Sequence, residues 1–182
     1  MSDDTLSKFL SLVLRHNPTL IGLTLGDGGW VQVDELLAAL ARNGRPVERA
    51  KLQQLVRESD KQRFALSPDG SLIRANQGHS VNVDLGLSAT PPPDVLFHGT
   101  VARYLTSIRE HGLLKGKRQH VHLSATPELA VLVGQRRGAP HVLQVDARGM
   151  ASAGCVFYRS ENGVWLAEHV PVRFLTNIPR AD

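Results

Sequence analysis

Hydrophobic residues near the start of the chain recur every three or four positions, which is the spacing of a helix with one buried face. The residues with this spacing are Leu6, Phe9, Leu10, Val13 and Leu14. Residues 2–4 supply side chains that cap a helix N-terminus, and Pro18 disfavours a helical conformation for the residue before it. The pattern therefore predicts a first helix that ends near Arg15 and His16.

In the next part of the chain, the spacing of the hydrophobic residues changes several times between that of a helix and that of a strand. The predicted elements are a strand at 30–33, a helix capped by Asp34 that ends near Gly44, a helix at 47–58, and a hairpin of 63–66 with 71–74. A helix, a strand, two helices and a hairpin are the order of a winged-helix domain. Such domains usually read nucleic acid through the second paired helix. Residues 47–58 mix charges of both signs, which is more typical of a solvated face.

Short strands dominate the second half. The predicted strands are 95–97, 120–124, 141–145, 155–159, 164–167 and 172–175, with helices at 102–110 and 127–134. This mixture predicts an α+β fold class. Three prolines at 91–93 form a stiff joint. We therefore expect a winged-helix lobe at 1–77, a linker at 78–92 and an α+β lobe at 93–182.

The positive charge of the chain is concentrated in its second half. The formal net charge is +4, and residues 1–90 hold ten Lys/Arg and ten Asp/Glu, whereas residues 91–182 hold eleven and seven. This asymmetry indicates an anionic ligand of the second lobe. Cys155 is the single cysteine, the start is acidic and no long apolar run occurs. We therefore expect a soluble, cytoplasmic protein without a membrane partner, and a monomer.

The segment from Lys115 to Ser124 holds three Lys/Arg, two histidines and no carboxylate. It ends in an alternating run that places His120 and His122 on one face of a strand. This composition favours a phosphate ligand. Two histidines without a third ligand nearby argue against a metal, and the sequences typical of serine hydrolases and Gly-rich phosphate loops are absent. A cation-lined site without an evident base suits a nucleophile that is already ionised, such as a phosphate monoester with a second pKa of about 6.

Six segments carry a resemblance to a known family. They are Leu-Arg-His-Asn-Pro at 14–18, Arg-Ala-Asn-Gln-Gly-His-Ser at 74–80, His-Gly-Thr at 98–100, Arg-Gln-His-Val-His-Leu-Ser at 118–124, Gly-x-Arg-Arg at 134–137 and Asn-Gly-Val-Trp-Leu at 162–166. In this order they resemble the RNA 2′-phosphotransferases, a family similar to the enzyme that completes tRNA splicing. The resemblance covers nearly the whole chain.

The resemblance implies a winged-helix RNA lobe joined to an NAD-binding lobe of the ADP-ribosyltransferase fold. It implies that an internal RNA 2′-phosphate attacks C1″ of NAD⁺, which serves as co-substrate without a metal, and that the ribose 2″-hydroxyl then releases the RNA. The catalytic residues that it implies are Arg15, His16, Arg63 and Arg118. The residues that it places in or near the NAD site are His98, Gly99, Thr100, Ser124, Arg136 and Arg137.

Two alternatives remain open at this point. An ADP-ribosyltransferase of the same fold can cap terminal phosphates of nucleic acid or modify protein. Protein-modifying members carry a late glutamate on a strand, where the best alignment places Val164, with Glu161 in the neighbouring turn. That departure disfavours protein modification and leaves RNA with a 2′-phosphate as the expected partner.

Overall fold

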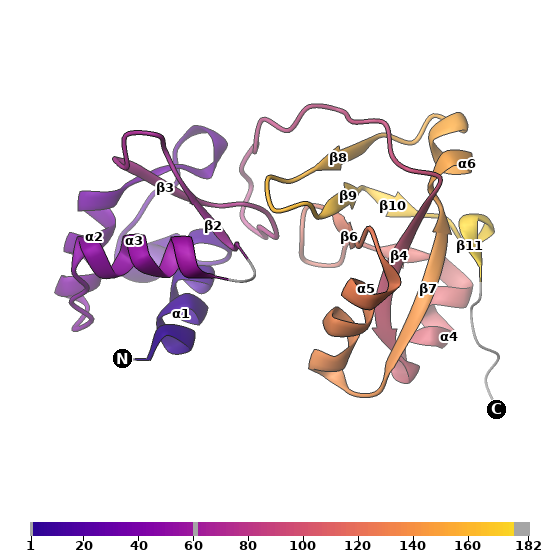
Figure 1. The fold of residues 1–182 in the computed structure, drawn as a ribbon, viewed down its shortest axis with the longest axis horizontal. Coiled ribbons are helices and arrows are strands. Elements are labelled where there is room, and N and C mark those ends of the chain that lie inside the picture. Colours follow the sequence, from indigo (N-terminus) through magenta and orange to yellow (C-terminus); the bar gives the residue numbers. More distant parts are fainter. Residues whose placement is uncertain (1, 60–61, 177–182) are drawn as a thin grey trace. The chain divides into compact units, whose positions relative to one another are not determined.

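A computed structural model describes residues 2–59 and 62–176, and the chain divides into two compact units, Met1–Gly86 and Leu87–Asp182 (Figure 1). Helices and strands are mixed along the chain, in agreement with the predicted α+β class. No helix in the two described stretches is both long and apolar enough to cross a bilayer. Each unit has a hydrophobic core of its own.

In its described residues, 2–59 and 62–86, the first unit contains three α-helices and a small antiparallel sheet. Its elements are α1 (Asp3–Arg15), η1 (Pro18–Ile21), η2 (Asp27–Gly29), β1 (Val31–Gln32), α2 (Val33–Arg42), α3 (Arg49–Glu58), β2 (Phe64–Leu66) and β3 (Leu72–Ala75). The strand order is β1-β3-β2. The predicted helices and the hairpin are confirmed, and the Ser2 side chain caps α1 by accepting from the Thr5 amide.

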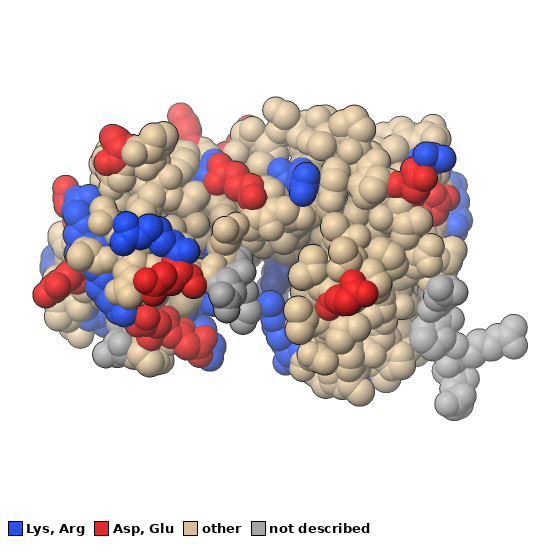
Figure 2. Space-filling view, in the orientation of Figure 1, with Lys and Arg blue, Asp and Glu red and all other residues tan. Residues whose placement is uncertain are grey.

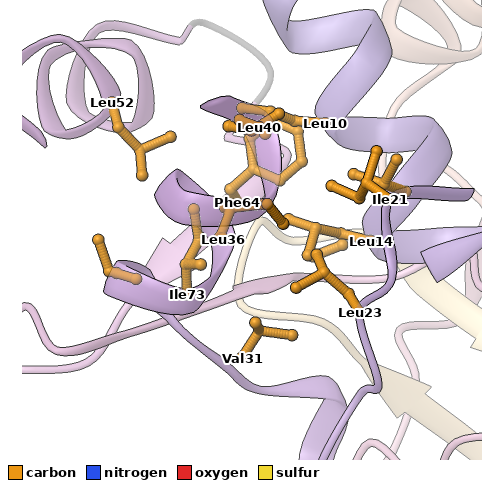
Figure 3. Packing of buried hydrophobic residues seen from close by; sticks show 14 of the residues in the cluster. Leu10, Leu14, Ile21, Leu23, Val31, Leu36, Leu40, Leu52, Phe64 and Ile73 are labelled. Atoms are coloured by element: carbon orange, nitrogen blue, oxygen red, sulfur yellow. The ribbon is translucent and has the colours of Figure 1, made fainter. Parts of the chain in front are cut away.

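The core of the first unit lies between the helices and the sheet (Figure 3). Leu10 and Leu14 of α1 and Leu36 and Leu40 of α2 belong to this core, and all four are fully buried. One prediction for this unit is wrong. Asp34 does not cap α2, because the helix begins at Val33, two residues earlier than a cap at Asp34 implies, and Gln32 occupies the cap position. Asp34 lies in the first turn, where its charge still favours the helix dipole.

Residues beyond the hairpin remain attached to the first unit. The Gly28 amide donates to the Asp84 carbonyl at 3.1 Å, and the Ser80 amide donates to the Arg15 carbonyl at 2.9 Å. These bonds fix part of the stretch at 78–92 on the first unit. The Ser80 contact also brings the stretch to the end of α1.

The second unit, as described up to residue 176, is a set of short antiparallel strands with three α-helices. Its elements are β4 (Val95–Val101), α4 (Ala102–His111), β5 (Leu113–Leu114), β6 (Val121–Leu123), α5 (Pro127–Gly134), η3 (Gln135–Arg137), β7 (Pro140–Asp146), α6 (Ala147–Ser152), β8 (Phe157–Arg159), β9 (Trp165–Ala167), β10 (His169–Val170), η4 (Val172–Phe174) and β11 (Leu175–Thr176). Its sheets have the orders β11-β7-β4, β6-β9-β8 and β10-β5.

Most of the predicted elements of this unit are confirmed. Thr126 caps α5 with its side chain, Gly112 ends α4, and β8 pairs with β9 as a hairpin. Residues 172–175 are not one strand, since 172–174 form a 3-10 turn and only Leu175–Thr176 pairs with β7. The helix α6 was not predicted because its six residues are too few for a periodic pattern.

Gly99 allows α5 to lie directly against β4. A Cβ atom at this position would lie 1.8 Å from the Ala130 carbonyl oxygen and 2.9 Å from the Gly134 amide nitrogen, both of them main-chain atoms of α5. No rotamer change can relieve a clash with the main chain. The glycine in the His-Gly-Thr segment is therefore explained by packing between a strand and a helix.

Replacing Gly99 with alanine is expected to lower the free energy of unfolding of the second unit by about 3 kcal/mol or more, because α5 must move away from β4. Chemical denaturation followed by Trp165 fluorescence in a Trp30→Phe background measures this. The control is Gly154→Ala, where a Cβ meets nothing within 4 Å. That control should cost roughly 1 kcal/mol through its positive φ alone. Equal losses in the two variants would contradict the packing explanation.

Candidate functional site

Three of the predicted catalytic residues lie in the first unit around the end of α1. Arg15 is the last residue of this helix, and its Nη2 donates to the Arg63 carbonyl oxygen at 3.1 Å. His16 follows as the C-terminal cap, with its Nδ1 2.9 Å from the Ser80 Oγ. The end of α1 thus contacts the start of the hairpin and the stretch after it.

The segment after β3 holds this arrangement together. The Asn76 amide donates to the Arg63 carbonyl at 3.0 Å, and its side-chain Nδ2 donates to the Gln62 carbonyl at 2.6 Å. Ser80 binds both the Arg15 main chain and the His16 ring. Asn76 and Ser80 were not predicted as site residues. Their place in the 74–80 segment of the resemblance was the available signal.

The Arg63 guanidinium contacts a different part of α1. Its Nη1 donates to the Ser7 Oγ at 2.7 Å, at the side of a pocket that Asp3, Asp4 and Glu58 also line. Ser7 and Arg15 are eight residues apart on α1, or roughly 12 Å along the helix axis. The structure therefore brings the Arg63 main chain, and not its guanidinium, to Arg15.

His79 is buried beneath this group, at 1% exposure. Among the described residues, neither ring nitrogen has a partner close enough and well enough aligned for a hydrogen bond. The nearby Leu14 main chain raises the pKa of the ring, but this is the smallest of the effects on it. Burial, followed by the charges of Arg15, His16 and Arg74, lowers the pKa of His79 to about 4. His79 is therefore uncharged at neutral pH.

His79 should make the first unit sensitive to acid. Between pH 6.5 and pH 4 the unfolded chain protonates this ring while the folded one does not, so stability falls as the pH falls through that window. The shift corresponds to about 3 kcal/mol at its full extent. The free energy of unfolding is measured at several pH values by chemical denaturation, followed by Trp30 fluorescence in a Trp165→Phe background. It should depend less on pH in the His79→Asn variant than in its parent. The exposed His111→Asn is the control, and equal pH dependence for His79→Asn and its parent would refute the assignment.

In the second unit, β4 and β6 place His98 beside Ser124. The Phe97 amide donates to the Ser124 carbonyl at 2.9 Å, and the Ser124 amide donates to the Phe97 carbonyl at 2.7 Å. His98 Nδ1 lies 3.0 Å from the His122 carbonyl oxygen, to which it donates. Burial lowers the pKa of His98, and Arg137 and Arg118 lower it further. A neutral His98 that donates from Nδ1 keeps Nε2 as an acceptor.

Three predicted arginines lie close to this pair of strands. Arg136 and Arg137 form η3, which contacts β4, and the Arg137 carbonyl accepts from Arg103 Nη2 at 3.2 Å. Arg118 is exposed, but nearby protein atoms still remove part of the water around its guanidinium. This desolvation lowers the pKa of Arg118, and the charges of Arg137 and Arg136 lower it further. Within residues 2–59 and 62–176, no carboxylate lies within ion-pair distance of these three arginines. Mutual repulsion without a counter-charge favours an anionic ligand.

The two remaining predicted site residues, Gly99 and Thr100, contribute to the packing of β4 against α5. Thr100 is buried at 5% exposure on β4, beside Gly99, and its carbonyl faces Gly134 of α5. The structure thus brings His98, Gly99, Thr100, Ser124 and the arginines of this unit into one region. His122 also lies in this region, where it contacts His98 and Arg118. The sequence placed it on one face of a strand with His120 but assigned it no role.

The surface of α3 is unlike this cationic region. Arg49 pairs with Asp34, and Lys51 pairs with Asp3 at 2.8 Å, so neighbouring carboxylates offset its positive charge. Acidic and basic side chains are mixed over the face that carries α3 (Figure 2). These pairs favour the interpretation of α3 as a solvated face.

Fold and site together define a two-unit α+β protein whose second unit holds Arg118, Arg136 and Arg137 near His98, with no carboxylate of the described residues within ion-pair distance of these arginines. The model of the "RNA 2′-phosphotransferase, Tpt1 / KptA family" matches residues 1–169. A probable RNA 2′-phosphotransferase of Pseudomonas paraeruginosa is 56% identical over 174 residues, which cover 95% of each chain. Similar proteins of the same description occur in Agrobacterium fabrum, at 55% identity over 93% of this chain and 91% of the relative, and in Acaryochloris marina, at 51% over 94% and 95%. The chain belongs to the RNA 2′-phosphotransferase family.

Proposed function

We propose that this protein is an enzyme that removes an internal 2′-phosphate from RNA, with NAD⁺ as co-substrate. Family membership supports an RNA 2′-phosphate as the substrate. We assign the first unit to a winged-helix RNA-binding lobe and the second to an NAD-binding lobe of the ADP-ribosyltransferase fold. The order of elements in the first unit, and the short strands with α4 and α5 in the second, support these assignments.

One observation carries the NAD⁺ proposal. The second unit holds Arg118, Arg136 and Arg137 without a carboxylate partner among the described residues, beside a histidine that stays neutral. A pyrophosphate supplies the missing negative charge, and guanidinium groups bind its oxygens in a bidentate manner. Neutral His98 and the Ser124 hydroxyl add uncharged polar groups for the ribose or the nicotinamide amide.

The first chemical step needs no base. One oxygen of the RNA 2′-phosphate attacks C1″ of the ribose attached to nicotinamide, the C1″–N bond breaks, and neutral nicotinamide leaves. The phosphate is already largely ionised at neutral pH. The protein therefore contributes alignment and charge stabilisation, which fits arginines better than proton-transfer groups.

The second step needs proton transfer. The ribose 2″-hydroxyl attacks phosphorus, the bond from phosphorus to the RNA 2′-oxygen breaks, and that oxygen takes up a proton. The products are RNA with a free 2′-hydroxyl and ADP-ribose 1″,2″-cyclic phosphate. We assign the proton transfer to His16, because Ser80 orients its ring and His79 is uncharged with a pKa of about 4.

The direct test is to incubate the full chain with NAD⁺ and an RNA that bears one internal 2′-phosphate, and to analyse RNA and small molecules by mass spectrometry. The expected products are 2′-hydroxyl RNA and the cyclic phosphate of ADP-ribose, with no product when NAD⁺ is left out. The matched control RNA carries its phosphate at the 5′ end instead. ADP-ribosylation of the terminal phosphate without conversion of the internal one would overturn the proposal in favour of the capping activity.

A further inference from the structure

Arg118 lies on an exposed loop, yet its guanidinium is held at one place. Residues 114–118 are all exposed, and the loop is closed by a hydrogen bond from the Arg118 amide to the Lys115 carbonyl at 3.2 Å. The Arg118 Nη1 lies 3.0 Å from the His122 Nδ1. An arginine on a loop otherwise loses considerable conformational entropy when a ligand orders it. This contact therefore settles its direction in advance.

His122 is fixed by the sheet. It lies in the middle of β6, opposite Leu166 of β9, and is half-buried. Its carbonyl oxygen accepts from His98 Nδ1 at 3.0 Å. One residue thus contacts a predicted phosphate-binding arginine through its side chain and a predicted NAD-site histidine through its main chain.

The chemistry of the contact determines the state of the ring. A guanidinium group only donates hydrogen bonds, so the His122 Nδ1 accepts, and a neutral ring then carries its proton on Nε2. A neutral acceptor orients the arginine and leaves its positive charge available to a ligand. A carboxylate in the same place would offset that charge and repel a phosphate.

We propose that His122 is a positioning residue that holds the Arg118 guanidinium ready for the phosphate by accepting its hydrogen bond at Nδ1. The inference rests on the proposed function, in which Arg118 binds the reacting phosphate. His122 does not contact the reacting atoms in this role. Its effect passes through Arg118.

Conservative substitutions separate positioning from general packing. Asparagine carries its amide oxygen on Cγ, the atom to which Nδ1 is bonded in histidine, whereas the amide of glutamine lies one atom farther out, nearer the place of Nε2. His122→Ala should slow removal of the 2′-phosphate by about tenfold through the lost ordering of Arg118. His122→Asn should restore most of the rate, and His122→Gln should resemble alanine. His122→Asp should still orient the Arg118 guanidinium, but removal of the 2′-phosphate should remain slow because the carboxylate offsets the charge of Arg118.

A double-mutant cycle tests whether the effect passes through Arg118. Single-turnover rates are measured with the full chain in excess, so that slow variants remain measurable. His122→Ala should slow the reaction in the parent but not in an Arg118→Ala background. The matched control is His120→Ala, on the same face of the strand, whose ring packs against Tyr158 at 5.5 Å instead. Its effect should be the same in both backgrounds. Equal slowing by His122→Ala in both backgrounds would overturn the inference.

A structural readout keeps this test separate from the proposed function. The guanidinium N–H signals of Arg118, assigned in ¹⁵N NMR spectra through the Arg118→Ala variant, report the hydrogen bond without any substrate. They should persist in His122→Asn and lose their protection from exchange in His122→Gln and His122→Ala. Lack of turnover by the parent protein would refute the proposed function alone. Unchanged Arg118 signals in His122→Ala would refute the positioning role, whatever the activity.

Discussion

His16→Ala is expected to slow the second step by about 10²–10⁴-fold and to let ADP-ribosylated RNA accumulate, because proton transfer contributes about that much to such a step. The first step has an ionised nucleophile and should change far less. A quenched time course that resolves substrate, intermediate and product RNA on a gel gives both rates. The matched control is His111→Ala, an exposed histidine whose ring contacts the Ser107 carbonyl in its own helix.

The accumulation of intermediate is the decisive observation for His16. If the variant loses the first step in the same proportion and never shows intermediate, the ring positions the phosphate instead of moving a proton. Ser80→Ala refines the result. This variant removes the Ser80 hydroxyl, which lies 2.9 Å from His16 Nδ1. The ADP-ribosylated RNA should therefore accumulate, but to a smaller extent than in His16→Ala.

Arg118→Ala is expected to lower the rate of 2′-phosphate removal by about 10²–10³-fold, the loss typical when one preorganised group that stabilises transition-state charge is removed. Arg118 has no carboxylate partner among the described residues, so its whole charge is available to the ligand. Arg118→Lys should recover only part of the rate, because an ammonium group supplies the charge without the planar pair of donors.

The control for this prediction is an arginine whose charge is already offset. Arg148 pairs with Asp94 at 2.6 Å in the same unit, so Arg148→Ala should leave the rate nearly unchanged. Rates are measured at two ionic strengths to separate a local contact from long-range attraction of RNA. Full recovery by Arg118→Lys would show that charge alone matters, and would contradict the bidentate role.

The sequence by itself determined the elements whose patterns are long or strongly marked. The five hydrophobic residues of α1 with Pro18 beyond it, and the patterns at 127–134 and at 63–66 with 71–74, each predicted an element that the structure contains. Local sterics and burial of one face act within a few residues there. Where the pattern was short, as in α6 and at 172–175, local preference was too weak to decide.

The residue types of the site were also evident from the sequence, since arginines and histidines without nearby carboxylates are visible along the chain. Only the tertiary structure decided what each of them contacts. It directs the Arg63 guanidinium toward Ser7, places His79 in a buried environment beneath His16, and joins Arg118 to His122. The Arg63 and His79 contacts depend on how segments far apart in the chain pack against α1, whereas the Arg118–His122 contact depends on the conformation of the loop that leads into β6. Hydrophobic pattern and charge along a chain specify which groups are present, whereas hydrogen bonding and desolvation after packing specify what those groups can do.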